Sequence, residues 1–80
     1  MEKEDLLKEL SILFQEVLED SSIELTPETT ANDVDKWTSL NNMLLISTIE
    51  RKYNIHFSFR EIVKLKNVGD LADAIIKKTN

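Results

Sequence analysis

The sequence of 80 residues contains no cysteine, one glycine and one proline. Without cysteine the chain has neither disulfide bonds nor thiolate metal ligands, so its stability must come from packing. With 41% apolar residues, this composition is typical of a folded helical domain rather than a disordered segment. No apolar run approaches the roughly 20 residues that span a bilayer, and the charged start at residues 1–5 is unlike a signal peptide. We therefore expect a cytoplasmic protein without a membrane partner.

The length of the chain limits what it can enclose. Eighty residues make one domain, here predicted to span residues 1–80, near the lower end of what a single hydrophobic core can hold. An enclosed active site is not expected at this size, and no constellation of His, Cys or paired carboxylates points to catalysis or to a bound metal. The sequence therefore predicts a protein that is not an enzyme. We expect a monomer, and a homodimer stays open as an alternative.

Charge is distributed unevenly along the chain. Residues 1–38 carry eleven acids and three lysines, a net charge of −8, whereas residues 39–80 carry four acids and seven bases, a net charge of +3. The total of −5 argues against nucleic acid as a partner, because phosphate binding needs a basic face. A basic partner would be attracted mainly to the first half.

The first half of the chain is predicted to hold one helix and a long connection. Leucine and other apolar residues recur at helical spacing from about Glu4 to Leu18. Residues 21–38 show no sustained apolar period and include a predicted turn at Thr26–Glu28, with proline at its preferred position. We expect this loop to be anchored to the core by its few apolar side chains, which are Ile23, Leu25, Val34 and Trp37.

A second helix is predicted from Ser39 to Tyr53. Thr38 is placed to cap it, which makes Ser39 the first helical residue and leaves its hydroxyl facing solvent. Asn54 suits the left-handed residue that often ends a helix. The predicted buried face comprises the residues that recur at spacings of three and four, namely Leu40, Met43, Leu44, Ile46, Ile49 and Tyr53.

Two further helices are predicted in the remaining chain. Ser58 and Glu61 form a capping-box pattern, so a short third helix should begin at Phe59. Asn67 is placed to cap the last helix, which is expected over about Val68–Lys78. The predicted fold is all-α, a four-helix bundle with a long loop between the first two helices and a short third helix.

Several segments of this chain resemble the acyl carrier protein family, which includes the peptidyl carrier domains. Trp37–Asn41 is similar to the Trp-Asp-Ser-Leu-Asn run of many carriers. Residues 49–55, 57–62 and 67–71 resemble, in the same register, the end of the family's second helix and the starts of its third and fourth helices. The resemblance covers about Ile12 to Lys78 and implies a bundle of the acyl-carrier-protein type.

The resemblance also implies a function. A phosphopantetheinyl transferase would attach 4'-phosphopantetheine from coenzyme A to Ser39, and a helix start favours a phosphate there. The chain would then carry acyl or aminoacyl thioesters to loading and transferring enzymes of fatty-acid, polyketide or nonribosomal peptide biosynthesis. The partner contacts expected from the resemblance are Thr38, Leu40, Asn42 and Met43, although Met43 is equally compatible with a place in the core.

Three departures from the family pattern keep alternatives open. Thr38 stands where the family usually has an aspartate that contacts the transferase, Lys36 replaces a common glycine, and Glu50 is the only acid of the second helix. These departures favour an alternative, a carrier-like module that stays unmodified and binds proteins through a helix. A hydrolytic enzyme that uses Ser39 with His56 is a further alternative, but no orienting acid or oxyanion hole accompanies the pair, and we expect His56 to be structural or solvated.

Overall fold

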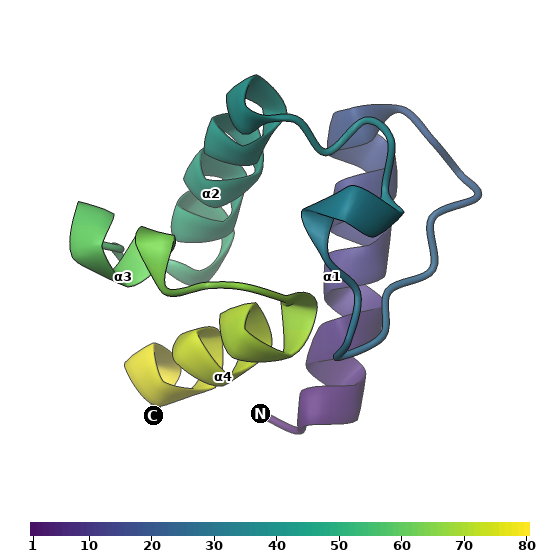
Figure 1. Ribbon diagram of the computed structural model, residues 1–80. Coiled ribbons are helices and arrows are strands. Elements are labelled where there is room, and N and C mark those ends of the chain that lie inside the picture. The colour runs from purple at the N-terminus through teal and green to yellow at the C-terminus, as the bar shows by residue number, and fades with distance from the viewer.

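The computed structural model describes all of residues 1–80 and contains four α-helices, one short 3-10 helix and no strand. Figure 1 shows α1 and α2 standing on opposite sides of the bundle, with α4 below α2 and beside the lower half of α1, and α3 at the outer edge of α2. The all-α, four-helix prediction is confirmed. The elements in chain order are α1 (Lys3–Leu18), η1 (Ala31–Asp33), α2 (Ser39–Tyr53), α3 (Phe59–Val63) and α4 (Val68–Thr79).

A single hydrophobic core lies between the helices, and α1 contributes most to it. Five residues of α1 are buried, all on the stripe predicted from their spacing. The loop contributes Ile23 to the core, and Leu25, Val34 and Trp37 pack against it, so the predicted anchors are confirmed. The buried apolar residues are Leu6, Leu10, Leu13, Phe14, Leu18, Ile23, Leu45, Ile46, Ile49, Phe57, Val68, Leu71, Ala72 and Ile75.

The predicted face of α2 is only partly right. Leu45, Ile46 and Ile49 are buried, but Leu40, Met43 and Leu44 are respectively 77%, 53% and 53% exposed. At about 3.6 residues per turn, apolar residues at all these positions cannot share one face, and the later group turns toward α1 and the core. The first turns of α2 therefore present apolar side chains to solvent, and Met43 is a surface residue.

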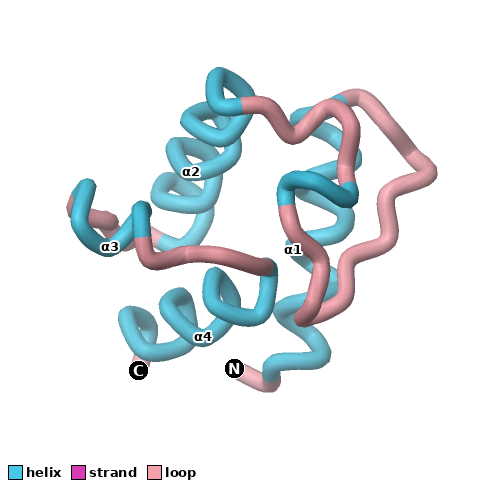
Figure 2. The backbone as a smooth tube through the Cα atoms, viewed as in Figure 1, coloured by secondary structure: helices cyan, strands magenta, loops and turns pink.

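The long loop runs along the outer side of α1 and returns through η1 to the start of α2 (Figure 2). Its η1 turn was not predicted, although Thr30 and Asp33 show the capping pattern, and the Thr30 amide donates to Asp33 Oδ2 at 2.9 Å. The predicted turn before it is confirmed by a hydrogen bond from the Thr29 amide to the Thr26 carbonyl, 3.1 Å long.

The middle of the loop is fixed to the beginning of α4. The Val68 amide donates to the Thr29 carbonyl at 2.9 Å, and the Gly69 amide donates to the Pro27 carbonyl at 2.8 Å. These two amides belong to the first turn of α4 and have no partner within the helix. The loop supplies their acceptors, and this holds η1 opposite α2.

The remaining predicted helix ends are confirmed. Asn54 ends α2 with φ of 55°, in the left-handed region. The Ser58 hydroxyl accepts from the Glu61 amide at 3.2 Å, and Asn67 Oδ1 accepts from the Asp70 amide at 2.8 Å. None of the helices combines the length with the apolar character that crossing a bilayer requires.

Candidate functional site

The start of α2 leaves Ser39 exposed because another residue caps the helix. Thr38 has an extended backbone, with φ of −90° and ψ of 172°, and its Oγ1 accepts from the Asn41 amide at 3.2 Å. The side chain of Asn41 donates to the Lys36 carbonyl at 2.7 Å and fixes the approach to the helix. The Ser39 hydroxyl therefore lies at the first helical position with no part in the cap.

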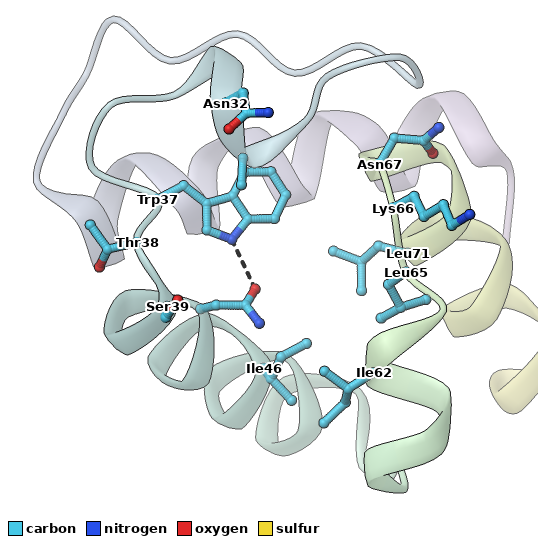
Figure 3. A pocket seen from close by; sticks show the side chains of 12 residues that line it. Asn32, Trp37, Thr38, Ser39, Ile46, Ile62, Leu65, Lys66, Asn67 and Leu71 are labelled. Atoms are coloured by element: carbon cyan, nitrogen blue, oxygen red, sulfur yellow. Dashed lines mark hydrogen bonds between the residues drawn. The ribbon is translucent and has the colours of Figure 1, made fainter.

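Trp37 anchors the segment that leads into this site. Its indole packs edge-on against the Phe14 ring of α1, with centroids 4.9 Å apart and planes at 89°. Its Nε1 donates to Asn42 Oδ1 at 2.8 Å, the bond drawn as a dashed line in Figure 3. The predicted anchoring role of Trp37 is confirmed. The indole thereby joins the core to the first turn of α2.

A cleft of about 430 Å³ opens beside Ser39, between α2, α3, η1 and the start of α4. In Figure 3, Ile46 of α2 and Ile62 of α3 face one another at its apolar end, while Asn32, Asn67 and Lys66 lie on the sides away from α2. The cleft is thus apolar where Ile46 and Ile62 meet and partly polar on the sides away from α2. Its lining comprises Ala31, Asn32, Trp37, Thr38, Ser39, Asn42, Ile46, Ile62, Leu65, Lys66, Asn67 and Leu71.

The surroundings of the Ser39 hydroxyl favour an attached anion. The first turn of α2 contains no acidic residue, and the leading amides of a helix, together with its dipole, attract negative charge. Lys36 would add positive charge here, but its Nζ instead donates to the Glu19 carbonyl at the end of α1, 3.2 Å away. The attraction for an anion at this position therefore comes from the start of α2 itself.

The predicted site residues separate into two groups. Thr38, Ser39, Leu40 and Met43 are exposed around the start of α2. Asn42 is half-buried, and its Oδ1 holds Trp37, so this side chain faces the cleft. Sequence reasoning missed this pairing, although a half-buried indole N–H needs an acceptor and Asn42 lies in the first turn of the adjacent helix.

The arrangement excludes a serine–histidine pair. His56 follows the far end of α2, whose 15 residues span about 22 Å at ~1.5 Å per residue. The His56 side chain is 86% exposed, and its Nδ1 lies 3.3 Å from Glu50 Oε2. The predicted solvated role of His56 is confirmed, and Ser39 cannot use it as a base.

Comparison with known proteins agrees with this geometry. The model of the family described as "Phosphopantetheine attachment site" matches residues 8–75. Among curated proteins, none matches the chain significantly. The chain is similar to the solution NMR structure of holo acyl carrier protein from Geobacter metallireducens, with 53% sequence identity and a TM-score of 0.86. That similarity covers 90% of this chain and 83% of the other.

Proposed function

This chain belongs to the phosphopantetheine attachment site family, and from that premise we propose that Ser39 bears the 4'-phosphopantetheine arm of an acyl carrier protein. The family makes the chain a carrier that depends on a phosphopantetheinyl transferase and on acyl-handling enzymes. The assignment of the arm to Ser39 is carried by one observation. Ser39 combines an exposed hydroxyl at the first position of α2 with a place in the wall of the adjacent cleft.

The residues around Ser39 fit the chemistry of the arm. Ser39 would supply one of the two ester oxygens of the phosphodiester, and the acid-free first turn of α2 would stabilise the attached phosphate. When bound, the arm supplies a terminal thiol that forms thioesters with acyl groups. The cleft gives the arm or its cargo a surface to lie against, with Ile46 and Ile62 at the apolar end and Asn42 in its wall.

The enzymes that act on the arm are proposed to contact the exposed residues around Ser39, namely Thr38, Leu40 and Met43, with Asn42 reached through the cleft. We further propose that residues 1–80 act as one monomeric domain in the cytoplasm, where coenzyme A supplies the arm. The net charge of −5 argues against nucleic acid as a partner.

Intact-protein mass tests the assignment. The unmodified protein is incubated with coenzyme A and a phosphopantetheinyl transferase, alongside Ser39→Ala. Ser21→Ala is the matched control, since it removes an exposed serine hydroxyl in the loop, away from α2. We expect the native protein and Ser21→Ala to gain the mass of one arm and Ser39→Ala to gain none. A folded native protein that gains no mass, even with the transferase of its own host, would instead favour an unmodified interaction module.

A further inference from the structure

The side-chain amide of Asn42 is held in one orientation by the indole beside it. An indole N–H can only donate a hydrogen bond, so the Asn42 atom that lies 2.8 Å from Trp37 Nε1 must be the oxygen, Oδ1 (Figure 3). The nitrogen, Nδ2, is bonded to the same planar carbon and is therefore turned away from the indole. The Trp37 hydrogen bond thus determines which end of the Asn42 amide is left for other groups.

Asn42 Nδ2 is a donor group that has no acceptor within the protein. The only hydrogen bond of this side chain is the one that Oδ1 accepts from Trp37. Every buried side-chain nitrogen or oxygen of the chain has a hydrogen-bond partner. Because Nδ2 has none, it is not buried, and the half-buried Asn42 side chain lines the cleft beside Ser39. The two N–H groups of Nδ2 are therefore accessible from the cleft.

The residues of α2 that line the cleft follow one another along the helix. Ser39, Asn42 and Ile46 are spaced three and four apart, so they share one side of α2. At about 1.5 Å of rise per residue, Asn42 lies about 4.5 Å beyond Ser39 along the helix axis, and Ile46 about 10 Å beyond it. A group that is attached to Ser39 and runs along this side of α2 passes Asn42 before it reaches Ile46 and Ile62.

The lining of the cleft contains hydrogen-bond donors but no carboxylate. Its polar side chains are those of Asn32, Thr38, Ser39, Asn42, Lys66 and Asn67. Two of the three asparagine oxygens already accept hydrogen bonds, Asn42 Oδ1 from Trp37 and Asn67 Oδ1 from the Asp70 amide at 2.8 Å. A ligand that offers acceptor oxygens therefore suits this lining better than one that offers only donors.

We propose that Asn42 Nδ2 donates a hydrogen bond to an amide carbonyl of the phosphopantetheine arm and so holds the arm in the cleft. This proposal rests on the proposed attachment at Ser39. The arm contains amide carbonyls between its phosphate and its thiol, and a carbonyl oxygen is a suitable acceptor for an amide N–H. Asn42 is then a binding residue for the arm, and Trp37 is a positioning residue that keeps Nδ2 directed into the cleft.

The two ends of the Asn42 amide can be separated by substitution. Asn42→Asp keeps an oxygen for the Trp37 indole but replaces the Nδ2 donor with a second oxygen. Trp37→Phe keeps an aromatic ring against Phe14 but removes the indole donor, so the Asn42 amide is no longer held in one orientation. Asn41→Asp is the matched control, because it makes the same change of charge one residue away, at a side chain outside the cleft lining.

The experiment measures the mobility of the arm by NMR relaxation. Holo protein is prepared from isotope-labelled coenzyme A, so that the order parameters of the amide N–H groups of the arm are observed directly. Labelled protein with and without an unlabelled arm gives the signals of the Asn42 side-chain NH2 group, which are identified by their absence from Asn42→Asp. Circular dichroism establishes that each variant is folded, and the native spectra alone test the contact where a variant is not.

In the native protein we expect attachment of the arm to shift the Asn42 NH2 signals, and at least one amide of the arm to have an order parameter above about 0.6, the upper limit for a flexible group. In Asn42→Asp and Trp37→Phe the same amide should fall below about 0.6, whereas Asn41→Asp should resemble the native protein.

Two results would overturn the arm contact while the attachment stands. One is a native arm that is flexible throughout, and the other is an arm that is as ordered in Asn42→Asp as in the native protein. A chain that acquires no arm on Ser39 is a different outcome, because it overturns the attachment itself and the arm contact with it.

Discussion

Thr38 caps α2, and this leaves the Ser39 hydroxyl without a structural role in the helix start. A helix start needs a side chain to accept from its leading amides, and Thr38 Oγ1 serves the Asn41 amide. Because Thr38 occupies the cap, the next hydroxyl along the chain stays exposed. The threonine therefore preserves the helix start, even though the Asp of the related motif is missing.

Removing the cap should weaken the fold without touching Ser39. We expect Thr38→Ala to lower the free energy of unfolding by about 1 kcal/mol, the usual cost of losing a hydroxyl cap. Thr38→Asp should retain the native stability, because aspartate also caps and its charge suits the helix dipole. Urea unfolding measures both variants, and an alanine variant as stable as the native protein would contradict the capping role.

Trp37 and Asn42 show how far single residues can be interpreted from sequence. The anchoring of Trp37 could be predicted, because a lone large aromatic at the end of a polar loop tends to be buried. The role of Asn42 could not, because its exposure depends on how α2 is rotated. The contact of Asn42 with partner enzymes stays a prediction, while the hydrogen bond that its Oδ1 accepts from the half-buried indole was not predicted.

At the scale of the elements, local sequence patterns predicted the ends of the helices better than their buried faces. Caps depend on residues three or four apart, so Ser58, Asn67 and Asn54 could be identified from sequence. The buried face of α2 depends on where α1 lies, and apolar residues occur nearly all round its first turns. The η1 turn was missed because its capping pattern lies within a polar segment that has no apolar period.

Gly69 is a test of the contact between the loop and α4. A Cβ added there would lie 2.9 Å from the Pro27 carbonyl oxygen, which is backbone and cannot turn aside. Helix propensity alone would make alanine more stabilising than glycine by up to about 1 kcal/mol. The clash with the Pro27 carbonyl oxygen acts in the opposite direction and destabilises the alanine variant.

We expect Gly69→Ala to lower the free energy of unfolding by roughly 1 kcal/mol or more, since overpacking costs about 1–3 kcal/mol. Lys77→Ala, at an exposed position of the same helix, should remain within about 0.5 kcal/mol of the native protein. Chemical unfolding compares the two. A stabilised Gly69→Ala would show that propensity outweighs the contact with Pro27.

The ion pair between α3 and α4 should make stability depend on pH. The hydrogen bond from Lys78, followed by those from Ser58, lowers the pKa of Glu61 from its ordinary 4.5 to about 2. A lowered pKa in the folded state gives stability that is present above pH 4.5 and is lost as the pH falls toward 2.

Glu61→Gln keeps a capping side chain but removes the charge. We expect it to be less stable than the native protein at pH 7 and to lose less stability between pH 5 and pH 2. Glu28→Gln, which removes an exposed carboxylate outside any ion pair, is the control. Parallel pH profiles of Glu61→Gln and the native protein would contradict the stabilising role of this pair.

At the scale of the whole molecule, one core joins all four helices and the loop. The fluorescence of Trp37 reports on the loop, while far-ultraviolet circular dichroism reports on the helices. If residues 1–80 are one cooperative domain, the two signals should follow the same transition in urea. A fluorescence transition that clearly precedes the loss of helix would show that the loop unfolds separately.

The overall architecture could be predicted because helix periods and caps are local, and the related segments agreed in register. The cleft could not, because it requires η1, α3 and the start of α4 to meet opposite α2. The charge asymmetry was visible in the sequence. Which of those charges are free depends on contacts such as Glu61 with Lys78, which only the folded chain reveals.

The most direct test of the carrier assignment is to locate the arm on the protein isolated from its native host. Cleavage after Lys36 and Arg51 gives one peptide, residues 37–51, that holds Ser39 together with Thr38, Ser47 and Thr48. Fragmentation of this peptide by tandem mass spectrometry distinguishes the four hydroxyls. We predict the arm on Ser39 alone. A peptide that carries the arm on another residue, or one that is unmodified throughout, would contradict the account.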